Sequence, residues 1–186
     1  MAIPDWAEIG IPDGYGPERL IYNPPSEMVI AELRSIGEEF SPNRIYMRHR
    51  DSLRYEPIKS FEPMVSYESA VTSSSQPTLF YMSNKVTKGE QGYSGDWVGL
   101  YSFDLLKRTE SLIAREGSLS LPVPYNRGWV SRLLGTTEDA SELYLTLGMV
   151  VENTSPGFHM VNHQLARMVV ETKSVHLVSQ LKGTFF

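Results

Sequence analysis

The sequence predicts an all-β protein built from antiparallel strands. Short apolar runs alternate with clusters of Gly, Pro, Ser and Asn, one order of strands and turns recurs, and helical periodicity is nearly absent. The chain has 186 residues, 41% of them hydrophobic, and no cysteine, so it can bury a core without disulfides. Thiol catalysis and cysteine-ligated zinc or iron–sulfur centres are excluded because each needs a sulfur ligand or nucleophile.

The clearest strands form a pattern that occurs twice, about 65 residues apart. Each copy has an apolar strand, a Gly-containing connection, a second apolar strand, a polar turn and a third strand. The successive pieces are 79–82, 97–103, 107–110 and 111–114, then 142–147, 165–170, 171–174 and 175–178. A recurrence of this length indicates structural repeats rather than a single irregular sheet.

Weaker strand-like pieces upstream of each copy, and an earlier pair of strands near residues 44–58, extend the pattern to three units. We expect an irregular lead-in at 1–18, which holds three prolines and three glycines, followed by a single all-β domain over 19–186. The expected four-stranded units are 19–60, 64–116 and 120–180.

Residues 26–40 fit two structures. Val29, Leu33, Ile36 and Phe40 fall at i, i+4, i+7 and i+11, which is a helical stripe, and Ser26 could cap a helix after two prolines. A strand at Met28 to Leu33 fits the four-stranded unit equally well. The sequence leaves helix and strand open here.

The hairpins formed by 100–104 with 107–112, and by 165–170 with 171–177, resemble blades of TolB-like and WD40-like β-propellers, although the Trp-Asp and Gly-His signatures of WD40 repeats are absent. The resemblance implies about three blades, and closed propellers have four to eight. We therefore expect a homodimer that forms one six-bladed ring. The alternative is a β-sandwich or barrel, which suits the same length.

Candidate ligand contacts gather near the expected loops of the second and third units. Trp and Tyr there offer contact area and a polar group at low entropic cost. The alternative for Trp97 and Trp129 is that they only pack between blades. The candidate ligand- or partner-contact residues are Tyr93, Asp96, Trp97, Tyr125, Arg127 and Trp129.

Charge and segment composition limit the partners. The net charge is −5 with no long basic run, so nucleic-acid binding is not expected. No stretch approaches the ~20 apolar residues of a membrane span, and the N-terminus lacks a secretory signal, so we expect a cytoplasmic protein without membrane contact. His159 and His163 stand four apart without the H-E-x-x-H glutamate, so no metal and no cofactor are expected.

These observations favour a non-catalytic binding or scaffolding module whose partners are a second copy and a protein or small-molecule ligand. The alternative is a hydrolase or lyase with a polar site at the channel mouth, built across a dimer. Catalytic residues on such a scaffold would be scattered among blades, and no motif identifies them.

Overall fold

A computed structural model of the chain describes residues 7–36, 41–89, 92–151 and 160–178. These residues form twelve β-strands and one short 3₁₀ helix, η1 (Pro24–Ser26). The strands are β1 (Tyr15–Asn23), β2 (Met28–Ser35), β3 (Arg44–His49), β4 (Glu56–Pro57), β5 (Val65–Thr72), β6 (Thr78–Gly89), β7 (Gly92–Asp104), β8 (Thr109–Ala114), β9 (Arg127–Thr136), β10 (Glu142–Val151), β11 (Met160–Val169) and β12 (Val175–Leu177). None of the described segments is a helix long and apolar enough to span a membrane.

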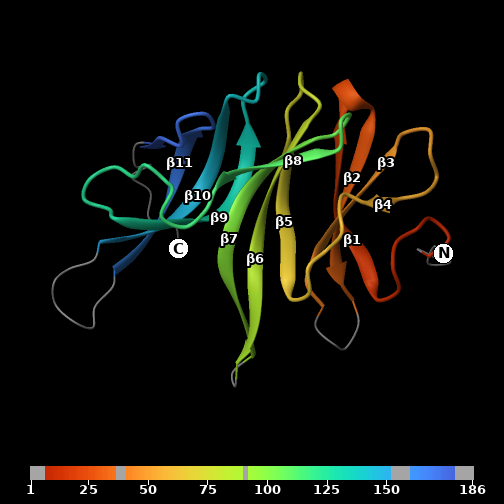
Figure 1. Cartoon of the computed structure of the whole chain (residues 1–186), viewed down its shortest axis with the longest axis horizontal. Coiled ribbons are helices and arrows are strands. Elements are labelled where there is room, and N and C mark those ends of the chain that lie inside the picture. The colour runs from red at the N-terminus through yellow and green to blue at the C-terminus, as the bar shows by residue number, and fades with distance from the viewer. Residues whose placement is uncertain (1–6, 37–40, 90–91, 152–159, 179–186) are drawn as a thin grey trace, which may run out of the picture.

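The strands form three four-stranded antiparallel sheets, each paired in chain order from its first strand to its last. Figure 1 shows the sheets side by side, with the second sheet (β5–β8) between the first (β1–β4) and the third (β9–β12). Strand β5 contacts both β1 and β9, so the first strands of the sheets lie next to one another. The all-β class and the three four-stranded units predicted from the sequence are confirmed.

The second sheet is apolar on both faces because side chains alternate along a strand. On β6, Leu79 and Tyr81 pack against the first sheet, and Phe80 and Met82 pack against the third. These four side chains are at most 2% exposed. Such a sheet is stable only between two others, which is the arrangement of a propeller blade.

The segment that precedes β1 covers the outer face of the first sheet. Ile11 is 2% exposed and packs with Leu33, Tyr46 and Tyr55, and Ile9 lies at the edge of this cluster. The lead-in therefore buries apolar surface that would otherwise face water. It ends earlier than the sequence predicted, because β1 begins at Tyr15 within the expected irregular region 1–18.

The turns that close the last hairpins of the second and third sheets have the same backbone geometry. The amide of Arg108 donates to the Asp104 carbonyl at 2.8 Å, and the amide of Lys173 donates to the Val169 carbonyl at the same distance. Arg108 and Lys173 both have φ near +60°, at 56° and 58°. The recurrence seen in the sequence thus corresponds to a repeated turn in the structure.

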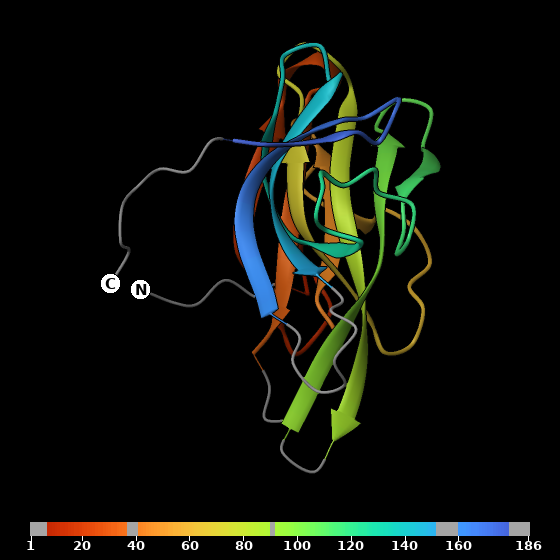
Figure 2. The ribbon, with the colours of Figure 1, turned by 90° about the vertical axis from the view of Figure 1, so that its left-hand side faces the viewer.

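The structure decides between helix and strand where the sequence left both open. Residues 28–35 form a strand, and Phe40 lies outside the described residues. The helical stripe misleads because β2 is the second strand of its sheet and is buried on both faces, so its apolar residues do not alternate. The Gly-rich stretch between Gly89 and Gly99, expected as a loop, instead extends β6 and β7 into a long hairpin, which Figure 2 shows projecting beyond the neighbouring strands.

Candidate functional site

Four of the six predicted contact residues line one pocket between the second and third sheets. Asp96 and Trp97 come from β7, and Arg127 and Trp129 come from β9, which lies beside β7. The cavity has a volume of about 620 Å³, and we call it the two-tryptophan pocket. Gly95, Glu116 and Val150 complete its lining.

Trp97 is the most buried polar group of this pocket. It is 8% exposed and belongs to the apolar core shared by the second and third sheets, as expected of a residue that packs between the sheets. Its indole Nε1 is buried and has no hydrogen-bond partner among the described residues. A buried donor without a partner costs about 1–3 kcal/mol, and buried indoles normally find an acceptor. This unpaired donor lies within the packed core and is closed off from solvent.

The indole ring of Trp129 packs directly against a glycine of the neighbouring strand in the third sheet. A Cβ atom at Gly148 would lie 2.3 Å from the Cε2 and Cζ2 atoms of Trp129, so the indole occupies space that only glycine leaves free. The imidazole of His163 meets the ring edge-on, with centroids 6.3 Å apart. Trp129 is only partly buried, so it can offer indole surface to the pocket it lines.

The rim of the pocket carries charges of both signs. Arg127 forms an ion pair with Glu116, with Nη2 and Oε1 2.6 Å apart and both side chains more than half exposed. Asp96 is exposed and pairs in register with Lys85 on β6. An exposed ion pair such as Arg127–Glu116 contributes little to stability, so its two groups can exchange partners at low cost.

The other two predicted residues have different surroundings. The hydroxyl of Tyr125 accepts a hydrogen bond from Gln164 Nε2 at 3.1 Å, and Tyr125 packs against the core shared by the second and third sheets instead of lining the pocket. Tyr93 lies on β7 opposite Lys88, but its side chain is outside the described part of the structure. Sequence reasoning missed Glu116, which approaches Arg127 only when the two sheets come together.

A second cavity, of about 500 Å³, lies along the first strands of the three sheets, where a propeller channel would run. Its lining includes consecutive pairs on each strand, Glu18–Arg19, Glu68–Ser69 and Ser131–Arg132. Each pair lies at an irregularity in strand pairing. Such bulges re-aim side chains and are common next to functional sites.

We call this second cavity the channel-side cleft. Two of the carboxylates that line it already accept hydrogen bonds from other residues. Glu32 accepts from the Arg19 guanidinium and from the Ala70 amide. Glu68 accepts from the side-chain amides of Asn43 and Asn84. These contacts join neighbouring strands and sheets, so these two carboxylates serve the packing of the fold.

One serine–histidine pair borders the channel-side cleft. Ser131 Oγ lies 3.4 Å from His163 Nδ1, and His163 is exposed on β11. Within the described residues no carboxylate pairs with His163, whereas a hydrolytic triad needs a third group that orients the histidine. Motif reading could not find this pair because its members are 32 residues apart.

A partly exposed cluster holds the Lys59 side chain against the second sheet. Its ammonium pairs with Glu110 Oε2 at 2.7 Å and lies over the rings of Tyr67 and Tyr101, at 4.9 and 5.1 Å from their centroids. Burial raises the pKa of the Tyr81 hydroxyl. The hydrogen bond that this hydroxyl donates to Glu110 raises the pKa further. Lys59 is thus occupied in fixing the connection after β4 to the second sheet.

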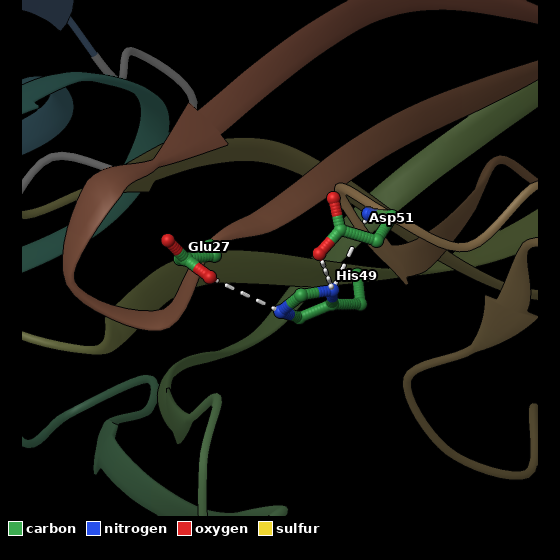
Figure 3. A group of neighbouring side chains, drawn as sticks. All are labelled: Glu27, His49 and Asp51. Atoms are coloured by element: carbon green, nitrogen blue, oxygen red, sulfur yellow. Dashed lines mark hydrogen bonds and ion pairs between the residues drawn. The ribbon is translucent and has the colours of Figure 1, made fainter.

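Glu27, His49 and Asp51 gather at the turns of the first sheet and offer three ligand atoms within 4.8 Å of one another. Figure 3 shows the two carboxylates on opposite sides of the imidazole. His49 Nε2 lies 3.4 Å from Glu27, and Nδ1 accepts from the Asp51 amide at 3.3 Å. Arg50 also pairs with Glu27 at 2.9 Å, so a cation would have to displace a guanidinium. The group is a surface ion-pair network.

Three four-stranded antiparallel sheets lie side by side in a propeller-like arrangement, and the two-tryptophan pocket lies between two of them. The chain is similar to an oligogalacturonate lyase from Vibrio parahaemolyticus, with a TM-score of 0.57 and 14% identity, over 92% of this chain and 39% of the lyase. It therefore spans well under half of that protein's length.

Two further solved structures are similar at lower scores. An oligogalacturonate lyase in complex with manganese has a TM-score of 0.49 and 12% identity, over 84% of this chain and 37% of that one. A GH74 xyloglucanase from Xanthomonas campestris has a TM-score of 0.48 and 10% identity, over 85% of this chain and 20% of that one. No protein-family model matches the sequence, and no curated protein matches it significantly.

Proposed function

We propose that the protein is a non-catalytic binding module whose ligand occupies the two-tryptophan pocket. The observation that carries this proposal is a cavity whose lining brings Trp97 and Trp129 together with the charged residues Asp96, Glu116 and Arg127. A cavity of about 620 Å³ falls in the ~300–1,000 Å³ range of small-molecule sites. Aromatic surface beside a few polar groups is the usual lining of such a site.

Calorimetric titration of the full chain and of Trp97→Phe tests the proposal. The probes are cellotetraose, trigalacturonate and choline, which represent uncharged, anionic and cationic ligands. We expect at least one probe to bind and the variant, whose smaller ring changes the lining of the cavity, to bind it at least about fivefold more weakly. If no probe binds, or if Trp97→Phe binds as tightly as the parent, the proposal is wrong.

The alternative of a hydrolase or lyase at the channel mouth has a narrower basis. The channel-side cleft offers the Ser131–His163 pair and the exposed Arg132, while Glu32 and Glu68 are engaged in packing. The lyase similarity is a similarity of fold at 14% identity and does not extend to its reaction. Binding without catalysis accounts for more of the described side chains.

A homodimer that completes the ring remains our proposal for assembly. Leu20, Tyr22 and Leu53 on the outer side of the first sheet are 59%, 46% and 84% exposed, and Leu134 and Tyr144 on the third sheet are 49% and 39% exposed. A second copy could cover such apolar surface on both terminal sheets at once. Light scattering at micromolar concentration should give twice the 21.0 kDa chain mass, and a monomer mass would refute the dimer.

A further inference from the structure

We infer that two copies of the chain meet where the third sheet of one copy lies beside the first sheet of the other. At this boundary, which we call the seam, Arg132 of one copy pairs with Glu18 of the other. The inference rests on the proposed homodimer and adds the contact that closes the ring. Both residues line the channel-side cleft, one at each end of the series of sheets.

The junctions inside the chain run from each sheet to the next one. Arg19 on the first sheet donates to the Ala70 carbonyl on the second sheet. Ser69 Oγ on the second sheet accepts from the Leu133 amide on the third sheet at 2.7 Å and donates to the Leu133 carbonyl. In both junctions a side chain of one first strand binds the peptide groups of the next first strand.

Contacts at the ends of these strands have the same direction. Asn23 Nδ2 donates to the Ser73 carbonyl at 2.8 Å, and Ser73 Oγ donates to the Glu138 carbonyl. Each link again joins one sheet to the following one. Among the described residues the series therefore ends at a third sheet with no following sheet, and begins at a first sheet with no preceding one. A second copy related by a two-fold axis supplies both.

Glu18, Glu68 and Arg132 occupy one position of the repeated first strand. The loop after each first strand is closed by a backbone pairing between residues five positions apart: Asn23 with Met28, Ser73 with Thr78, and Thr137 with Glu142. Glu18, Glu68 and Arg132 each lie five positions before the first residue of such a pairing. Because all three line the channel-side cleft, the equivalence in sequence is also an equivalence in space.

The two terminal residues of this set have opposite charges and no described partner. Glu18 and Arg132 are exposed, and within the described part of the chain neither side chain forms an ion pair. Glu68, in the central sheet, already accepts from two asparagine amides. Glu18 and Arg132 are two sheets apart within one chain, but lie on adjacent sheets across the seam. Arg19 already spans one such boundary, so an arginine side chain is long enough for this contact.

The charges also select which sheets meet. A contact between two first sheets would bring two Glu18 side chains together, and a contact between two third sheets would bring two Arg132 side chains together. Like charges that face each other across an interface are strongly disfavoured. Only the first-to-third contact pairs opposite charges. A two-fold axis forms this contact twice and closes the ring at six sheets.

Charge reversal tests the seam by analytical ultracentrifugation over nanomolar to micromolar concentrations. Glu18→Arg and Arg132→Glu each place like charges across the seam, so we expect each to raise the dimer dissociation constant at least about tenfold. The double variant Glu18→Arg/Arg132→Glu restores opposite charges and should recover most of this loss. Lys107→Glu, an equal reversal at an exposed turn of the second sheet, is the control and should leave the constant unchanged.

Recovery in the double variant also excludes misfolding as the cause of the single-variant effects. If the parent is a dimer and neither single variant weakens it, the seam contact is wrong and the homodimer stands. The contact is equally wrong if the single variants weaken the dimer and the double variant does not recover it. If the parent is a monomer throughout, both the contact and the homodimer fail.

Discussion

Ser69 on β5 makes two hydrogen bonds to the backbone of Leu133 on β9: its Oγ accepts from the Leu133 amide at 2.7 Å and donates to the Leu133 carbonyl at 3.3 Å. The two residues belong to neighbouring sheets, so one hydroxyl satisfies a donor and an acceptor across the blade boundary. Ser69 has φ of 58°, and this left-handed backbone forms part of the β5 irregularity. The bulge thus joins the second and third sheets.

Removal of the Ser69 hydroxyl should weaken this junction. Ser69→Ala leaves the Leu133 amide without its acceptor, and we expect the free energy of unfolding to fall by about 1–3 kcal/mol. Urea denaturation followed by circular dichroism measures the change. Ser94→Ala, an equivalent substitution at an exposed position of β7, serves as the control and should change stability by less than about 0.5 kcal/mol. Equal effects of the two substitutions would contradict the role of Ser69.

Gly148 should be essential for the placement of Trp129. An alanine Cβ would lie 2.3 Å from the indole, so Gly148→Ala must displace the ring or the strand. We expect a loss of about 1–3 kcal/mol in unfolding free energy and a changed tryptophan emission spectrum. Gly135→Ala is the matched control, because a Cβ there meets nothing within 4 Å. That variant should be unchanged or slightly more stable, and a spectrum unaffected by Gly148→Ala would refute the contact.

Asp139 should give the connection between β9 and β10 a dependence on low pH. Its Oδ1 accepts from Thr137 Oγ1 and Ser141 Oγ, both at 2.7 Å, and these bonds lower the carboxyl pKa from 3.8 to about 2. Because the pKa is lower in the folded state, the ionised carboxyl stabilises the fold above pH 3.8. This stabilisation is lost as the pH falls toward 2. Asp139→Asn should therefore melt below the parent at pH 7, with a gap that narrows between pH 3.8 and 2. A gap independent of pH would exclude this carboxyl as the cause.

Local chemistry made the later sheets predictable. The β10 residues Leu143, Leu145 and Leu147 alternate with the less buried residues between them, so the sequence pattern predicts the strand directly. The turn at Asp104 is equally local, because its carboxylate accepts from the Leu106 and Lys107 amides a few residues away. The aromatic and charged residues around Trp97 could be nominated for the same reason, since their residue types indicate ligand contact.

What escaped prediction depends on contacts that no local pattern specifies. Glu116 joins the pocket rim through Arg127 across the connection between β8 and β9, and Gly148 matters only because Trp129 lies on it. Residues 28–35 could not be assigned because a strand buried on both faces has no alternation. Distant contacts of this kind require the sheets to be stacked first, and local sequence does not specify the stacking.

Glu32 and Arg19 should be coupled through the peptide groups of Ala70. Arg19 Nε pairs with Glu32 Oε2 at 2.8 Å, Glu32 accepts from the Ala70 amide, and Arg19 donates to the Ala70 carbonyl. The two side chains thus bind both peptide groups of one residue in the neighbouring sheet. Because Glu32 is only 12% exposed, its contacts are weakly screened.

A double-mutant cycle of Glu32→Gln and Arg19→Met measures this coupling by urea denaturation. We expect each single variant to be destabilised and the coupling energy to reach about 1–3 kcal/mol, because either change disrupts the shared network. Glu32→Ala should be less stable than Glu32→Gln, since glutamine keeps an acceptor for the Ala70 amide. Additive effects would show that Glu32 and Arg19 act independently and that their ion pair does not contribute to the junction of the first and second sheets.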